Sequence, residues 1–154
     1  MSVHPRSTLK IAGHPLHPML VPLPIGFLVG AFLADLAYLF TGWASWAFFA
    51  TWLIAAGLVT AVVAAIGGLI DFFGEPRIRK LRPAWLHLVG NVVVLGLSLV
   101  NLLVHQRDGA AAVLPEGVIL SGAVAVLLVF TGWMGGEMVY RHKVAVLDED
   151  DVQR

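Results

Sequence analysis

Four long apolar stretches constrain the fold of this 154-residue chain more than any other feature of its sequence. A helix needs about 20 mostly apolar residues to cross the roughly 30 Å hydrocarbon core of a bilayer. Inside lipid every backbone polar group must be paired within the protein, so stretches of this length are helices and not strands. We place the four spans at Met19–Phe40, Trp46–Phe73, Ala84–Val104 and Gly117–Tyr140.

The composition agrees with a membrane protein and excludes several other classes. Hydrophobic residues make up 58% of the chain and charged residues 13%, against about 45–50% and about 25% in soluble domains. Ten basic and ten acidic residues cancel, so there is no excess positive charge to bind nucleic acid. Because the chain has no cysteine, disulfides, iron–sulfur clusters and c-type haem attachment are excluded, and a metal would need His, Met or carboxylate ligands.

Short connections between the spans predict an all-α, integral membrane four-helix bundle with up-down-up-down topology. Lys and Arg gather in both terminal tails and in the middle loop, residues 74–83, so these parts should be cytoplasmic, with Trp43 and Trp46 at the opposite interface. The predicted organisation is a cytoplasmic N-terminal segment at residues 1–18, a transmembrane domain at 19–140 and a cytoplasmic acidic tail at 141–154. No internal inverted repeat is detectable, which argues against a monomeric secondary transporter.

Polar side chains inside the spans are unevenly distributed, and such residues usually mark function or partners within the bundle. The cytoplasmic half should hold His14, His17, Asp71, His87, Asn91, Glu137 and His142. The other half holds only Asp35, Asn101 and His105. For Asp35 we expect a hydrogen bond to Asn101, with proton or ion passage as the alternative.

The first of these polar features is the segment Gly13-His14-Pro15-Leu16-His17-Pro18, which is followed by Pro22 and Pro24. Proline fixes φ and removes a backbone donor, so the chain should enter the membrane as a stiff, partly irregular segment. Such a segment can hold His14 and His17 as ligands of a metal or haem. The alternative is an interfacial turn whose imidazoles face water.

His87 and Asn91 lie one turn apart on the same face of the third span. The first and third helices of an up-down bundle run parallel, so His17 and His87 begin at the same depth. Facing imidazoles on two helices are the ligand geometry of a b-type haem. Arg77 and Arg82 can pair with haem propionates, or they can serve only as topology signals.

Other chemistries use the same residues. A divalent metal with tetrahedral ligation would take His14, His17, His87 and Glu137. Asp71 and Glu137 admit three interpretations: a proton relay, metal carboxylates, or ion pairs with the loop arginines. The small-residue motifs Gly26xxxGly30, Ala64xxxGly68 and Gly132xxxGly136 indicate close helix packing within the bundle, or a homodimer.

The segments GHPLHPMLVPLPIG and GWMGGEMVYRHKVAV, together with the His87/Asn91 pair, resemble a bacterial family of four-span membrane proteins catalogued as domain of unknown function 2231. The resemblance extends from Ile11 to Val146 and implies a multi-pass protein of the bacterial inner membrane. Related domains are fused to Rieske-type or cytochrome domains, which implies electron transfer. By position, the family's polar signature falls on His14, His17, His87, Glu137, Arg141 and His142. This chain has Lys143 and Ala145 where the family usually has glycines.

Taken together, these features predict a small redox protein that binds haem b near the cytoplasmic face through His87 and either His17 or His14. It would exchange electrons with a quinone or a partner redox protein, as an electron carrier or an oxidoreductase subunit, while Asp71 and Glu137 manage the accompanying proton. The alternatives are a divalent-metal-binding or transport protein and a cofactor-free accessory subunit of a membrane complex.

Overall fold

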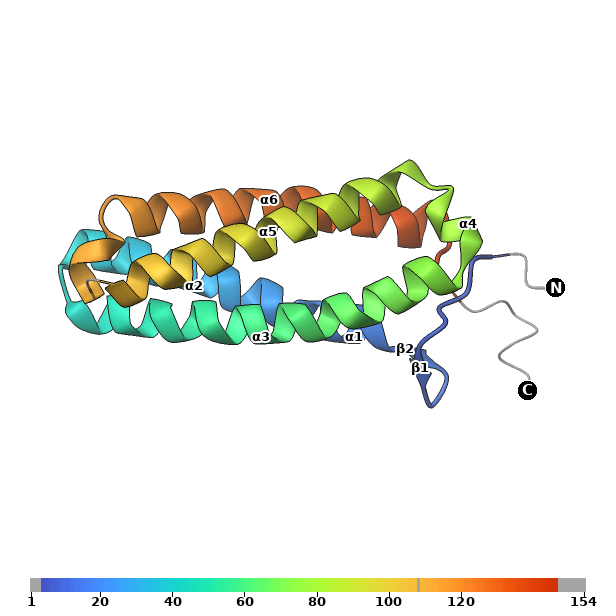
Figure 1. Cartoon of the computed structure of the whole chain (residues 1–154), viewed down its shortest axis with the longest axis horizontal. Coiled ribbons are helices and arrows are strands. Elements are labelled where there is room, and N and C mark those ends of the chain that lie inside the picture. The colour runs from blue at the N-terminus through green and yellow to red at the C-terminus, as the bar shows by residue number, and fades with distance from the viewer. Residues whose placement is uncertain (1–3, 108, 147–154) are drawn as a thin grey trace.

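Four long helices run side by side along the molecule in a computed structural model that describes residues 4–107 and 109–146 (Figure 1). The first span is built from α1 (Leu16–Leu20) and α2 (Pro22–Thr41), and the others are α3 (Ala44–Gly74), α5 (Arg82–Arg107) and α6 (Glu116–Tyr140). All four are long and apolar enough to cross a membrane. The all-α prediction and the four predicted spans are confirmed.

The entrance to the first span is irregular, as its prolines predict. Two short strands, β1 (Lys10–Ile11) and β2 (His14–Pro15), form a small antiparallel pair. The turn between them is possible because Ala12 and Gly13 take positive φ values of 48° and 80°. Pro22 then lies at the start of α2, where its missing N–H interrupts the helical ladder after α1.

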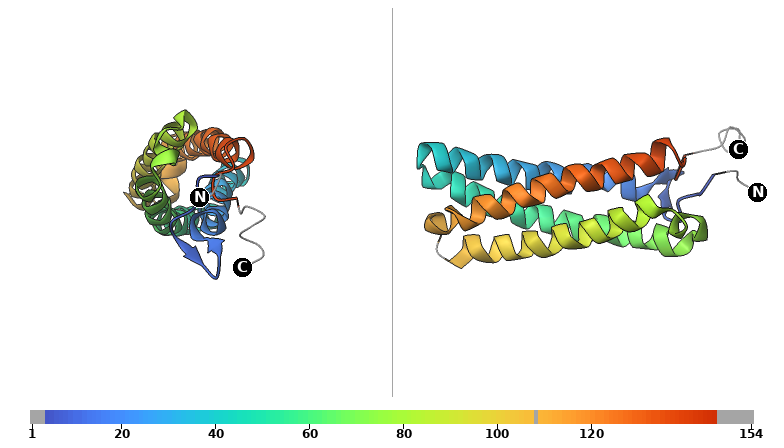
Figure 2. Two further views of the ribbon diagram at one scale, coloured as in Figure 1. Left: turned by 90° about the vertical axis from the view of Figure 1, so that its right-hand side faces the viewer. Right: turned by 90° about the horizontal axis from the view of Figure 1, so that it is seen from above.

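The helices form a ring in which neighbours in sequence are antiparallel (Figure 2). Because α2 and α5 each pack mainly on α3 and α6, α2 and α5 face each other across the ring. The described ends of the chain and the short helix α4 (Pro76–Arg79) lie at one end, which we call the termini end. The α2–α3 turn, closed by Gly42 with φ 69°, and the 3₁₀ helix η1 (Gly109–Val113) lie at the opposite end.

Apolar side chains are divided between the middle of the bundle and its outer surface. The central cluster consists of Leu28, Val94, Val124 and Leu128, which come from α2, α5 and α6. Large apolar side chains also cover the outside of the helices, including Leu33, Phe48, Val63, Val93, Leu103, Val126 and Val129. Such an exposed apolar surface is expected where the solvent is lipid.

The two halves of the bundle repeat one pattern of burial. In α2 the buried residues Pro24, Leu28, Ala31 and Asp35 recur in α5 at Val94, Ser98, Asn101 and His105 with the same spacing. In the second helix of each half, Ala50, Ile54, Gly57 and Ala64 of α3 recur in α6 at Gly117, Ser121, Val124 and Thr131. The bundle therefore consists of two equivalent helical hairpins in the same orientation. This is a parallel repeat and not an inverted one.

The C-terminal segment folds back on the N-terminal one at the termini end. The Ala145 N–H donates to the carbonyl of Pro5 at 2.9 Å, and the Val144 N–H donates to the carbonyl of Met138 at 3.0 Å. Lys143 and Ala145 have φ values of 55° and 62°, in the left-handed region that glycine enters without strain. Glycine would therefore fit the backbone at both positions. The predicted acidic run, Asp148–Asp151, lies outside the described residues.

The small-residue motifs do not all serve close packing within the bundle. A Cβ added at Gly26 or Gly132 would meet no other atom within 4 Å, and at Gly136 it would meet only Tyr140 of the same helix, at 3.8 Å. The packing interpretation is therefore wrong for Gly132xxxGly136. Ala64xxxGly68, by contrast, is in contact with the neighbouring helix.

Candidate functional site

A hydrogen bond and a close contact with a glycine hold the His17 side chain against α3. Its Nδ1 donates to the carbonyl of Ala64 at 2.8 Å. The ring lies so close to Gly68 that a Cβ added there would be 2.9 Å from His17 Cε1. Because a carbonyl oxygen only accepts, Nδ1 carries the proton, and Nε2 of the neutral ring keeps its lone pair.

His87 repeats this arrangement in the other half of the bundle. Its Nδ1 donates to the carbonyl of Thr131 on α6 at 2.8 Å, and a Cβ added at Gly135 would be 3.3 Å from His87 Cε1. In each half a histidine of the first helix therefore bonds a carbonyl of the second helix, with a glycine one turn further along. The repeat explains why the two imidazoles lie at the same depth.

The two imidazoles make an edge-to-face contact at the termini end of the bundle. Their ring centroids are 6.2 Å apart and their planes cross at 87°. Within residues 4–107 and 109–146, neither Nε2 has a hydrogen-bond partner. The pair therefore presents two neutral nitrogen donors, each with its other nitrogen fixed by a carbonyl.

The remaining predicted ligands lie at the same end but do not join this pair. Asn91 donates from Nδ2 to the His87 carbonyl at 2.7 Å, one turn below it in the same helix. His14 is exposed and bonds the carbonyl of Ala12 in its own turn at 2.9 Å. Glu137 forms an ion pair with Arg141 at 3.1 Å. In the described part of the chain, no group of three or more His, Cys, Asp or Glu side chains is arranged to hold a metal.

The predicted arginine partners lie in or beside the loop between α3 and α5. Arg77 pairs with Glu75 through bonds of 3.0 and 2.8 Å, and the hydrogen bond from Arg77 lowers the pKa of Glu75 to about 2. Glu75 also accepts from the Arg77 N–H at 3.1 Å and so caps α4. Arg82 is exposed at the start of α5. In the described contacts, Arg77 is thus paired with a carboxylate and Arg82 is not.

The described contacts of Asp71 are with the N-terminal segment. Its Oδ1 accepts from the N–H groups of Thr8 at 2.6 Å and Leu9 at 3.0 Å, and both of its oxygens accept from Ser7 Oγ at 2.9 and 3.0 Å. Asp71 therefore fastens the N-terminal segment to the end of α3. Glu137 has an arginine partner, but it is Arg141 at the end of its own helix and not one of the loop arginines.

Replacing Asp71 with Ala should free the N-terminal segment while the four spans stay folded. The change removes a buried acceptor of three donors, one of which is the hydroxyl of Ser7, a residue only 5% exposed. Limited proteolysis in detergent should then cut before His17 at least about tenfold faster, since the segment loses charge-assisted bonds of about 1.5–3 kcal/mol each. Glu137→Ala is the control, because Glu137 pairs only within its own helix end, and equal cleavage of the two variants would contradict the role of Asp71.

A second polar group lies at the opposite end, within the bundle. His105 Nε2 is 3.0 Å from Asp35 Oδ1, and both side chains are fully buried. Ser121 Oγ donates a short hydrogen bond to Asp35 Oδ2 and accepts from Asn101 Nδ2 at 2.8 Å. The expected partner of Asp35 is therefore corrected: Asn101 reaches Asp35 through Ser121, and His105 contacts Asp35 directly.

His105 is held as His17 and His87 are, by a carbonyl and a nearby glycine. Its Nδ1 donates to the carbonyl of Asn101 at 2.9 Å, and a Cβ at Gly117 would be 2.7 Å from its Cε1. Sequence reasoning did not identify His105 or Ser121 as site residues. The spacing was a usable signal, because Asp35 follows His17 at the same interval as His105 follows His87.

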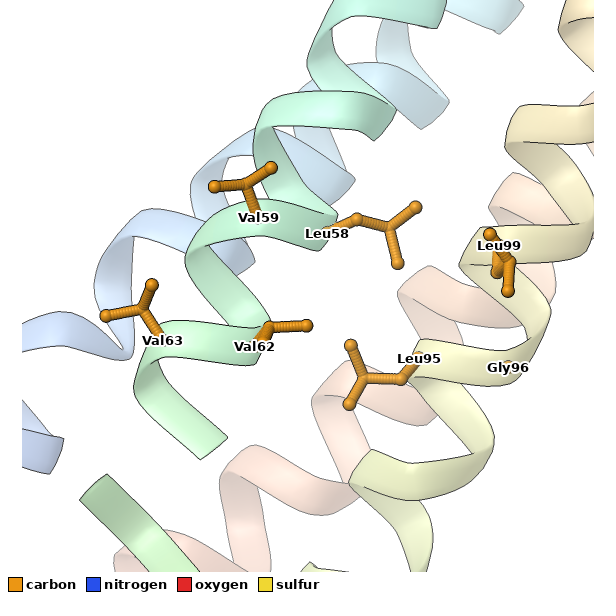
Figure 3. A pocket seen from close by; sticks show the side chains of 7 residues that line it. All are labelled: Leu58, Val59, Val62, Val63, Leu95, Gly96 and Leu99. Carbon is orange, nitrogen blue, oxygen red and sulfur yellow. The ribbon is translucent and has the colours of Figure 1, made fainter. Parts of the chain in front are cut away.

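An apolar groove opens between α3 and α5 (Figure 3). It has a volume of about 560 Å³ and is lined by Leu58, Val59, Val62, Val63, Leu95, Gly96 and Leu99. Its α3 side ends next to Ala64, which holds His17, and its α5 side lies one turn from Asn91. The groove is therefore an apolar hollow between the middle parts of α3 and α5.

These features define a four-span integral membrane protein that contacts the lipid bilayer through its apolar helices. The family described as "Predicted membrane protein (DUF2231)" has a model that matches residues 13–148, so the chain belongs to that family. No curated protein and no solved structure matches the chain.

Proposed function

We propose that this protein is a small electron-transfer protein of the bacterial inner membrane, in which His17 and His87 would hold one b-type haem. The observation that carries the proposal is the facing pair of imidazoles, each with Nε2 unbonded. The haem would supply one-electron redox chemistry. The protein residues would supply ligation, orientation and an apolar surrounding.

The separation of the rings agrees with ligation of a single metal by both. Metal–nitrogen bonds of about 2 Å from each ring would let both imidazoles reach one metal at such a spacing. The observed distance is 6.2 Å. Perpendicular ring planes are compatible with this, because each ring turns about its own metal–nitrogen bond.

The hydrogen bonds behind each ring also suit a ligand. A ligating histidine almost always donates its other N–H to a carbonyl, a carboxylate or water, which fixes its tautomer and its orientation. Ala64 and Thr131 provide such carbonyls. Because both histidines are already fixed, little side-chain entropy would be lost when a ligand binds.

The charge distribution supports cytoplasmic termini and gives this end a basic character. Folding gathers the Lys and Arg of both tails and of the α3–α5 connection at the termini end, whereas the opposite end has Arg107. Arg82 precedes His87 by less than two turns and is the arginine we assign to a haem propionate. The groove between α3 and α5 offers an apolar approach for the isoprenoid chain of a quinone from the bilayer.

The test is a reduced-minus-oxidised visible spectrum of the protein purified in detergent from cells supplied with haem precursor. We expect a b-type α-band whose intensity corresponds to one haem per chain, and we expect it to be lost in His17→Ala and in His87→Ala. His14→Ala is the matched control, because His14 is exposed, lies three residues from His17 and bonds only within its own turn. A folded wild-type protein without a Soret band would overturn the proposal.

A divalent metal is the second candidate for the same pair, and elemental analysis of the same preparation distinguishes it. Stoichiometric zinc or copper with no iron, lost in His87→Ala, would assign the pair to that metal. Glu137 and His14 would not complete that site, since both are held elsewhere. A preparation that contains neither iron nor any other metal would favour the cofactor-free accessory role.

A further inference from the structure

We propose that Asp35 and His105 form a proton-binding site, which holds one proton inside the bundle at the end opposite the histidine pair. About 27 Å separates His105 from His87 along α5, at about 1.5 Å of rise per residue. Between the two groups lies the apolar cluster of Leu28, Val94, Val124 and Leu128. The proposal is therefore independent of haem binding.

Hydrogen-bond accounting shows where the proton must be. The Asn101 carbonyl can only accept, so His105 Nδ1 carries a hydrogen. Asn101 Nδ2 donates to Ser121 Oγ, so the Ser121 hydrogen points to Asp35 Oδ2. One contact is left, the 3.0 Å between Asp35 Oδ1 and His105 Nε2.

That contact needs one hydrogen. If Asp35 were ionised and His105 neutral, a carboxylate oxygen would face the lone pair of Nε2, and the contact would be repulsive. With one added proton, the pair is either an aspartic acid with a neutral imidazole or a carboxylate with an imidazolium. Both forms have no net charge, whereas the pair without the proton leaves one negative charge in a site shielded from water.

The buried neighbours of the pair in the described part of the chain carry no compensating charge. Asp35 and His105 have fully buried side chains. The described residues of α3 and η1 buried at this end are Ala47, Ala50, Ile54, Ala112 and Val113, none of which titrates. From α6, Ser121 donates a hydrogen bond to Asp35, and Gly117 lies against the His105 ring. The remaining ionisable groups near these helix ends are Tyr38, which is half-buried, and the exposed Arg107 and Glu116; Asp108 lies outside the described residues.

The bound proton makes folding depend on pH in a defined direction. In the unfolded chain Asp and His titrate with ordinary pKa values of about 3.9 and about 6.5, so above about pH 6.5 the unfolded pair holds no proton. The folded pair holds one, so folding takes up a proton and stability falls as the pH rises. The folding equilibrium constant should fall about tenfold for each pH unit above about 7 while the folded pair keeps its proton.

Asp35→Asn is the decisive variant because it satisfies every hydrogen bond without the proton. The new amide would donate to His105 Nε2 and accept from Ser121, while His105 keeps its bond to Asn101. We expect the variant to match wild type in thermal unfolding in detergent near pH 6 and to be more stable than wild type near pH 9, where the difference reaches up to about a hundredfold in the folding equilibrium constant. Tyr38, Arg107, Asp108 and Glu116 are common to both proteins, so their titration cancels.

A direct proton count tests the site without any variant. Wild type unfolded with SDS in weakly buffered detergent near pH 8 should release one more proton per chain than its ordinary termini and side chains explain, detected with a pH-indicator dye. Asp35→Asn should not release it. No release from wild type, or parallel pH dependence of the two proteins from pH 6 to 9, would overturn the proposal.

Discussion

His105→Ala should lower the free energy of unfolding by about 3–5 kcal/mol, because it removes one partner of a buried polar pair and leaves the other behind. Asp35 is fully buried, and its Oδ1 has His105 Nε2 as its hydrogen-bond partner at 3.0 Å. The substitution also leaves space against Gly117, where the imidazole now packs. Reversible unfolding in mixed detergent and SDS micelles measures the change.

His87→Ala is the matched control for this prediction. It makes the same substitution in the same helix and removes the same kind of bond, from Nδ1 to a carbonyl, but His87 has no carboxylate partner. Its cost should be about 1 kcal/mol, the usual net value of one hydrogen bond. Adding Asp35→Asn to His105→Ala should recover part of the loss, since the carboxyl group is then gone. Equal costs for His105→Ala and His87→Ala would contradict the assigned importance of the Asp35 contact.

The fold is largely predictable from the sequence because lipid imposes few and strict conditions. Apolar length determines the spans, and each of the predicted spans lies within the observed ones. The prolines around His17 predict the irregular entrance, and the positions of Lys and Arg predict which segments share an end. The common depth of His17 and His87 also follows from sequence, because their helices run parallel and both histidines lie near the helix starts.

The details of the polar contacts are less predictable because they depend on helix rotation. Asp35 and His105 lie 70 residues apart on helices that face each other, and the register between those helices is set by packing with α3 and α6. A helix turns by about 100° per residue, so an error of one residue in phase would exchange Asn101 for a neighbour. The role of Asp71 was missed for another reason: its partners are the Ser7 hydroxyl and two backbone N–H groups, in a segment 62 to 64 residues away along the chain.

Gly68→Ala should displace His17 and weaken ligand binding at the histidine pair by about 10–100-fold, the usual effect of disturbing the groups that orient a ligating histidine. The added methyl would lie 2.9 Å from His17 Cε1 and 3.1 Å from Nδ1, so the ring must move. Movement of Nδ1 breaks the 2.8 Å bond to the Ala64 carbonyl. Titration of the apoprotein with haem, followed by the Soret band, measures the loss.

Gly132→Ala separates this effect from a general effect of alanine in an apolar helix. Its added methyl would meet nothing within 4 Å, so binding should be unchanged and the free energy of unfolding should rise by up to about 1 kcal/mol through helix propensity. Gly68→Ala should instead lower it by about 1–3 kcal/mol, the cost of overpacking, whether or not a ligand binds. Thermal unfolding thus tests the contact between His17 and Gly68 without any ligand. A stabilised Gly68→Ala would show that the ring has room to move. The close contact with Gly68 would then not be what positions the ligand pair.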